Sequence, residues 1–205
     1  MTRRGLALIL AALAGARVSE AQTPYRGLAK GEVLRGGFTQ ERRIKGFERP
    51  LVSGGDFVLA PGLGLIWRTQ RPFAIATVIT ASGLVQDVGG IETTRLSSQR
   101  LPFLARLYDL LGASLSGDWK VLETQFQVRR HGDVREWDLL LVPDAGVDPL
   151  AMPFQTISLR GGQFLDEVRI VRLDGDSDRL VFSDQTRAVG GLTGAELARL
   201  REAGK

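Results

Sequence analysis

Short stretches in which apolar and polar residues alternate fill most of the chain after residue 50. Phe57 and Leu59 are apolar positions of one such stretch. Leu65 and Trp67 occupy the same places in the next stretch, after a turn at residues 61–64 that contains proline and glycine. A period of two residues puts alternate side chains on one face of a β-strand, and proline and glycine favour tight turns. The pattern therefore predicts antiparallel hairpins.

The same alternation continues through the C-terminal half. The positions predicted to share strand faces are Phe126 and Val128 before a turn at 130–133, then Trp137, Leu139 and Leu141, then Phe154, Thr156 and Ser158, and finally Val168, Ile170, Leu180 and Phe182 around a turn at 174–177. Residues 77–80 and 83–87 form a further predicted hairpin. Strands joined in this way predict a curved antiparallel sheet.

One segment between these hairpins has a helical period instead. Its apolar residues, at spacings of three and four, are Leu101, Leu104, Tyr108 and Leu111. This spacing places them on one side of an amphipathic helix, which we expect over residues 102–115.

The C-terminus carries a second helix signal. Thr193 and Glu196 have the Thr-x-x-Glu spacing of a capping box, which predicts a helix that extends to about Ala203. A shorter helix over residues 25–34 is also predicted. The expected fold class is mainly β with α, and the helices are expected to lie against a single face of the sheet.

The N-terminus has the pattern of a secretory signal peptide. Arg3 and Arg4 precede an apolar run at residues 5–16, and Ser19 and Ala21 supply the small residues of a cleavage site. The apolar run is shorter than the roughly 20 residues that span a bilayer as a helix. We therefore expect a signal peptide over residues 1–21, a single domain over 22–205 and a periplasmic location; the alternative is an uncleaved anchor.

Composition narrows the possible classes of function. The chain has 27 Lys and Arg against 23 Asp and Glu, and the basic residues are scattered rather than gathered on one face. Nucleic-acid binding needs a clustered basic surface, so we expect no nucleic-acid partner. The chain contains no cysteine, so the fold has no disulfide, and no acyl chain can be attached at a lipoprotein cleavage site.

Residues that could support catalysis are few. His131 is the only histidine and is predicted to lie in a polar turn. Asp174, Asp176 and Asp178 alternate as in a calcium loop, but Arg179 stands where that loop needs glycine, so a solvated hairpin tip is predicted instead. No serine has a nucleophile-elbow motif. We therefore predict no enzyme activity, no catalytic residue, no cofactor and no metal site.

Several short motifs, taken in order, resemble the LolA family of outer-membrane lipoprotein carriers. They are GFTQ at 37–40, GDFVL at 55–59, LIW at 65–67, PF at 72–73, PFL at 102–104, GDW at 117–119, WDLLLVP at 137–143 and FQTI at 154–157. The resemblance extends from about residue 36 to residue 182. It implies an incomplete antiparallel β-barrel in which helices form a lid over an apolar cavity.

The resemblance also implies a task, which is to carry acyl chains of lipids or lipoproteins from an inner-membrane donor protein to an outer-membrane acceptor protein, as a monomer. The residues expected to line the cavity are Phe38, Phe57, Leu59, Leu65, Trp67, Leu104, Leu107, Tyr108, Leu111, Phe126, Trp137, Leu139 and Ile170. Composition alone does not distinguish such a cavity from a filled core.

Two departures from the family pattern bear on the cargo. The family's carriers place an arginine just before the proline-containing turn, where it bonds to the lid, whereas Ala60 precedes Pro61 here. Residues 44–53 resemble a divergent LolA-like branch that accompanies gene clusters for aryl polyene or other unusual lipids. The cargo is therefore a lipoprotein or another lipid-linked product. A lipid-sensing regulatory module on the same fold is the alternative, and an envelope hydrolase is disfavoured.

Overall fold

The computed structural model describes residues 28–29, 31–98, 123–124, 126–133, 135–144, 146 and 152–204. The predicted signal peptide and the predicted helix over 102–115 lie outside these residues. The strands are β1 (Glu32–Arg43), β2 (Leu51–Ala60), β3 (Gly64–Arg71), β4 (Ile75–Thr80), β5 (Gly83–Val88), β6 (Ile91–Ser97), β7 (Phe126–Gly132), β8 (Trp137–Pro143), β9 (Phe154–Gly161), β10 (Leu165–Arg172) and β11 (Ser177–Val189), and the described helix is α3 (Gly194–Ala203).

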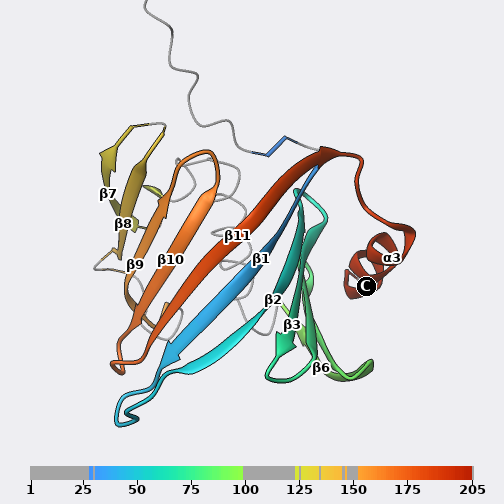
Figure 1. Ribbon diagram of the computed structural model, residues 1–205, viewed down its shortest axis with the longest axis horizontal. Coiled ribbons are helices and arrows are strands. Elements are labelled where there is room, and N and C mark those ends of the chain that lie inside the picture. The colour runs from blue at the N-terminus through green and yellow to red at the C-terminus, as the bar shows by residue number, and fades with distance from the viewer. Residues whose placement is uncertain are drawn as a thin grey trace, which may run out of the picture.

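All eleven strands belong to one antiparallel sheet with the order β6-β5-β4-β3-β2-β1-β11-β10-β9-β8-β7. Two runs of neighbouring strands, β1 to β6 and β7 to β11, meet where β1 pairs with β11 in the middle of the sheet (Figure 1). β6 and β7 are edges and do not pair with each other, so the sheet is open. This confirms the prediction of a mainly β, antiparallel and unclosed architecture.

The central pair of strands contains a bulge. Arg35 pairs with Thr186 and Gly37 with Ser183, so two residues of β11 lie opposite Gly36. One of them, Asp184, has a φ of 52°. A Cβ atom on Gly36 would lie 2.8 Å from Cε1 of Phe57, which is closer than packed carbon atoms approach, so only glycine fits at this point.

The sheet has two distinct faces. The inner face, defined by Phe57, Leu59, Leu65, Trp137 and Leu139, carries one contiguous buried apolar cluster that extends from β4 to β7. The outer face carries a second and smaller buried cluster near α3. Its members are Val33, Val58, Ala60, Ile66, Val78, Leu200 and Ala203. Burial of both faces explains why the β2 residues Phe57–Ala60 form a continuous apolar run.

The helix α3 begins with the predicted capping box. Thr193 accepts a hydrogen bond from the Glu196 backbone N–H at 3.2 Å, and Glu196 accepts one from the Thr193 backbone N–H at 2.9 Å. Leu200 and Ala203 turn towards the outer face of the sheet. The prediction of the helix is confirmed, but its expected place over the cavity face is wrong, because it covers the opposite face.

Two other local predictions are wrong. The helix predicted over 25–34 does not form at its C-terminal end, because residues 32–34 open β1 and bury Val33 and Leu34 on opposite faces. The turn predicted at 130–133 lies later in the chain, where the backbone N–H of Asp133 donates to the carbonyl oxygen of Glu136. His131 therefore lies in β7 and is exposed.

Candidate functional site

Four aromatic rings meet on the inner face where β1, β2, β3 and β11 lie side by side. Phe38 stacks on Trp67 with ring centroids 3.8 Å apart. The ring centroid of Phe57 lies 6.1 Å from that of Trp67, and it lies 5.4 Å from that of Phe182 in a T-shaped arrangement. The register places Phe57 opposite Trp67 and Phe38 opposite Phe182, so strand pairing itself brings the rings together. The predicted shared face of Phe57, Leu59, Leu65 and Trp67 is thereby confirmed.

The other half of the inner face, on β7 to β10, combines aliphatic side chains with the rings of Phe126, Trp137 and Phe154. Phe126, Trp137 and Leu139 are at most 5% exposed and belong to the same apolar cluster as Phe57. The Trp137 Nε1–H donates to the carbonyl oxygen of Gly162 at 2.9 Å, which satisfies the polar group of a buried indole. This hydrogen bond joins the indole ring to the turn between β9 and β10.

Part of the inner face remains accessible. The partly buried apolar side chains that pack against the cluster are Trp67, Leu84, Val128, Phe164, Ile170, Leu180 and Phe182. Three of them, Ile170, Leu180 and Phe182, lie on the neighbouring strands β10 and β11. Partly accessible apolar side chains therefore lie next to fully buried ones on the inner face.

One end of this face is polar. Asp178 is 3% exposed, and it accepts hydrogen bonds from Gln40 Nε2 at 2.9 Å and from Arg172 Nη2 at 2.8 Å. Arg42 forms an ion pair with Asp176 at 3.4 Å. Asp178 was predicted in a solvated hairpin tip; that is wrong, because its side chain points inward from β11 and is buried by these partners.

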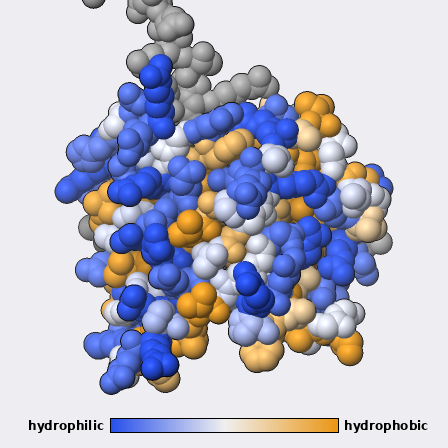
Figure 2. Space-filling model, viewed as in Figure 1, coloured by the Kyte–Doolittle hydropathy of each residue, from blue (hydrophilic) through white to orange (hydrophobic). Residues whose placement is uncertain are grey.

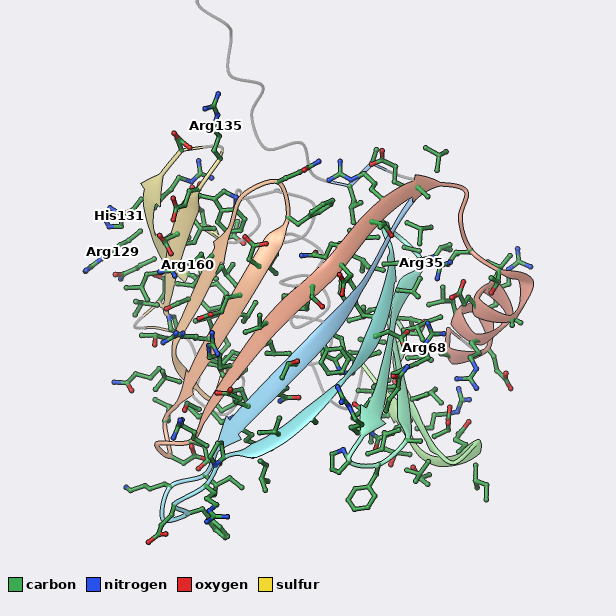
Figure 3. All side chains as sticks on the ribbon, in the orientation of Figure 1. Arg35, Arg68, Arg129, His131, Arg135 and Arg160 are labelled. Atoms are coloured by element: carbon green, nitrogen blue, oxygen red, sulfur yellow. The ribbon has the colours of Figure 1, made fainter. Side chains whose placement is uncertain are left out.

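The helix α3 is held on the outer face by arginines from two strands. Arg35 Nη1 and Nη2 each donate to a carboxylate oxygen of Glu196 at 2.7 Å, and Arg68 Nη1 lies 3.8 Å from the same carboxylate. Figure 3 shows both arginines between the sheet and α3. Mainly through the hydrogen bonds from Arg35, the pKa of Glu196 falls to about 2.

A polar hollow of about 360 Å³ lies on the outer face of β7 to β10. His131, Asp138 and Arg160 are among its lining residues, and Arg160 pairs with Asp138 at 2.9 Å. Figure 3 shows where His131 and Arg160 lie on these strands. Glu167 also lines the hollow, and its pKa is lowered chiefly by a hydrogen bond from Arg179. Both carboxylates are thus held as ion pairs, and no group of three or more metal-binding side chains occurs within the described part of the chain.

The structure brings together most of the residues predicted for the cavity. Six of them are buried in the inner cluster: Phe57, Leu59, Leu65, Phe126, Trp137 and Leu139. Trp67 and Ile170 are partly buried and pack against this cluster. Phe38 stacks on Trp67. The remaining four, Leu104, Leu107, Tyr108 and Leu111, lie outside the described residues. Whether any of them line a cavity stays a prediction.

Several residues of this face were not included in the predicted site. Among them are Leu34, Leu141, Ile157, Leu159, Leu165, Val168 and Phe182. Phe182 could have been found from its alternation with Leu180. Ile157 and Leu159 were missed because the predicted face of β9 was taken through Thr156 and Ser158, whereas the irregular pairing near Phe154 shifts the buried face by one residue.

A family model described as "Outer membrane lipoprotein carrier protein LolA-like" matches residues 13–202. This range includes all the described strands and nearly all of α3. The chain belongs to this LolA-like family. Members of the family are envelope proteins associated with lipid or lipoprotein binding, and they are carriers or binders rather than enzymes.

Solved structures similar to this LolA-like protein are distant in sequence. A LolA superfamily protein from Nitrosomonas europaea is 12% identical, with a TM-score of 0.42 over 79% of this chain and 88% of that one. A putative outer membrane lipoprotein-sorting protein domain from Vibrio parahaemolyticus is 10% identical, with a TM-score of 0.42 over 88% and 94%. The Pseudomonas aeruginosa MucA/MucB complex is 13% identical, with a TM-score of 0.47 over 82% and 56%. No curated protein matches the sequence significantly.

The described part of this LolA-like chain contains no helix that is both long enough and apolar enough to cross a membrane.

Proposed function

We propose that this LolA-like protein is a periplasmic carrier that binds the acyl chains of a lipoprotein or lipid-linked product and moves them between the inner and outer membranes. The observation that carries the proposal is the inner face, where Trp67, Ile170 and Phe182 remain partly accessible beside a buried apolar cluster. Family membership supports the same class of cargo.

The energetics of acyl-chain burial suit a carrier whose site is open on one side. Each buried methylene contributes about 0.8 kcal/mol, so complete burial of two long chains would make release too slow for transport. A sheet whose edges β6 and β7 do not meet leaves room for partial burial. The cargo is then held against water but can still leave for an acceptor.

In this proposal, the polar end of the inner face sets the orientation in which the cargo binds. Arg172 and Gln40 surround Asp178 where β1 and β10 end and β11 begins, beyond the aromatic rings. Acyl chains would lie along Trp67 and Phe182, and the polar part of the cargo would lie towards Gln40 and Arg172. This arrangement suits an amphiphile better than a fully apolar ligand.

The lid in this proposal is the helix predicted over 102–115. Its apolar side is formed by Leu104, Leu107, Tyr108 and Leu111, and an apolar helix side needs a partner surface. The proposal also includes cleavage of residues 1–21, a single carrier domain over 22–205, a monomeric state, and donor and acceptor proteins in the two membranes.

The test compares two neighbouring residues on opposite faces of β10. In Ile170→Glu the new carboxylate stands on the inner face, where an acyl chain would desolvate it at a cost of several kcal/mol. In Val171→Glu it stands on the outer face. Both proteins are purified from the periplasm, and bound lipid is measured by native mass spectrometry and by extraction.

We expect Ile170→Glu to fold, as judged by circular dichroism and thermal melting, but to carry at least about tenfold less lipid than the wild type. Val171→Glu should carry the wild-type amount. A wild-type protein without co-purified or exchangeable lipid, or a folded Ile170→Glu with its full load, would contradict the proposal. If lipid binds but is never delivered from one vesicle to another, the lipid-sensing alternative is favoured.

A further inference from the structure

The large apolar side chains exposed to water are unevenly distributed between the two ends of the sheet. Nine such residues are exposed in the described part of the chain. Seven of them lie at the end where β1, β3, β5 and β10 finish, and they are Phe47, Leu51, Val52, Phe73, Val88, Ile91 and Leu173. Among the described residues, the opposite end has only Leu63 and Val189.

We call the first end the lower rim and define it by the turns at 44–50, 72–74, 89–90 and 173–176 together with the residues next to them. In Figure 1 these turns form the lower edge of the molecule, and Figure 2 shows hydrophobic residues along that edge. Phe47 and Phe73 are each 71% exposed. Exposed apolar side chains that gather on one side of a protein mark a candidate interaction surface.

Basic side chains accompany these apolar tips. Arg43, Lys45, Arg49 and Arg71 are exposed on the lower rim, and none of them forms an ion pair with another described residue. The exposed carboxylates of the lower rim, Glu48 and Asp174, are fewer than these four basic residues, and Asp176 is occupied by Arg42 and by the backbone N–H of Lys45 at 3.0 Å. Positive charge is therefore available beside the apolar tips.

The two longest hairpins of the rim hold each other in place. The hydrogen bond from Lys45 N to Asp176 joins the β1–β2 turn to the β10–β11 turn. Leu173, 58% exposed, thus shares a corner of the rim with Phe47 and Leu51. The corner is presented by paired strands, so little further ordering is needed when it contacts a surface.

We propose that the lower rim docks on the surface of a bilayer that contains anionic phospholipids. Apolar tips would enter the interfacial layer, and the basic side chains around them would meet the lipid phosphates, which is how amphipathic segments bind membranes. The apolar residues lie singly on several turns along one edge rather than in one compact patch, and a planar surface can contact all of these turns together. This docking does not depend on what the inner face carries.

The experiment measures co-sedimentation of the full chain with vesicles of phosphatidylcholine alone or mixed with phosphatidylglycerol. The wild type should bind the mixed vesicles, and binding should weaken at high salt because the charges are screened. The double variant Phe47→Ser, Leu51→Ser should bind about tenfold more weakly, since two apolar contacts are lost. The matched control, Leu63→Ser with Val189→Ser on the opposite end, should bind like the wild type.

A fluorescent probe locates the contact independently. The chain contains no cysteine, so Glu48→Cys and Leu63→Cys each give a single labelling site. A polarity-sensitive dye at position 48 should shift to the blue on mixed vesicles, and the same dye at position 63 should not. Absence of wild-type binding, equal loss in both double variants, or a shift at position 63 alone would overturn the docking proposal, and the first result would assign the rim to a protein partner.

Docking and cargo binding can fail separately. Ile170→Glu leaves the lower rim untouched, so it should bind vesicles like the wild type. A protein that docks but carries no lipid contradicts the carrier proposal alone, and one that carries lipid but does not dock contradicts the lower-rim proposal alone.

Discussion

At the scale of single residues, glycine sets how closely β2 and β3 approach each other. The pairing of these strands shifts between Gly54 and Gly55, so that Gln70 is left over as a bulge. This irregularity brings the backbone carbonyl of Arg68 against Gly55, where a Cβ atom would overlap it. Because the obstacle is backbone rather than a flexible side chain, local adjustment cannot relieve it easily.

Gly55→Ala should therefore destabilise the protein by about 2 kcal/mol or more, since the strand pairing beside Phe38 and Trp67 must move. The control is Gly194→Ala, because a Cβ atom at Gly194 meets nothing within 4 Å and the residue lies in α3. That change should be neutral or stabilising by about 0.5 kcal/mol. Urea unfolding measures both, and an equal effect at the two positions would show that the bulge is not the cause.

The sequence predicted residues of the inner face well where alternation is regular. Phe57, Leu65 and Trp137 were found because no bulge interrupts the strand pairing at these positions, so a period of two residues assigns them to the correct face. The prediction failed at Ile157 and Leu159, because an irregular strand pairing puts them on the buried face. It also failed at Asp178, because an ion pair allows this carboxylate to be buried. Such features depend on how a strand pairs with its neighbour, and the sequence of one strand gives no information about that pairing.

At the scale of elements, α3 is attached by one carboxylate that has two roles. Glu196 completes the capping box with Thr193, and it also pairs with Arg35 across the outer face. The helix is short and carries few apolar contacts with the sheet, of which Leu200 and Ala203 are the buried ones. The ion pair and the cap therefore contribute a large share of what holds α3 in place.

Glu196 should make stability depend on pH. Its pKa is about 2 in the folded protein against 4.5 without these partners, so the folded state binds its proton less readily than the unfolded state. The stabilisation is then complete above about pH 4.5 and is lost as the pH falls from about 4.5 to about 2. Glu196→Gln should be less stable at neutral pH by about 2 kcal/mol, and the difference should shrink on acidification.

Urea unfolding between about pH 3 and pH 7 tests this. The control is Glu202→Gln, an exposed carboxylate of the same helix that forms no ion pair within the described chain. If the difference between the wild type and Glu196→Gln stays constant over this range, the ion pair with Arg35 does not stabilise α3.

The capping box made α3 predictable, but its place was not. The alternating pattern around Phe57 pointed to one buried face, and the helices were assigned to it. The continuous apolar run at residues 57–60 is typical of a strand covered on both faces, and it could have indicated that α3 packs outside. No local signal specifies which of two apolar surfaces a distant helix will cover.

At the scale of the whole molecule, the sheet has a protected middle and two exposed edges. β1, β2 and β11 are hydrogen-bonded on both sides, and β6 and β7 on one side each. The mainly β class and its open antiparallel form could be predicted from hairpin patterns and from the family resemblance. The order of the strands, with β11 returning beside β1, came from long-range pairing that no local pattern specifies.

Hydrogen exchange should follow this order. Amides of β2 and β3 should exchange only with global unfolding, because α3 and the inner cluster cover both faces. Amides of β6 and β7 should exchange first, through local opening at the edges. Mass spectrometry of pulse-labelled protein resolves the strands, and protection of β7 equal to that of β2 would contradict the arrangement.

The outer-face position of α3 gives the two halves of the sheet different stiffness. β3 and β4 lie between apolar layers, so they cannot bend without separating one layer from them. Within the described chain no helix covers the outer face of β8 to β10, where ion pairs such as Arg160–Asp138 can break and re-form in water. If a bulky ligand bound to the inner face, strands β8 to β10 would therefore bend to make room for it. Strands β3 and β4, which α3 covers, would keep their positions.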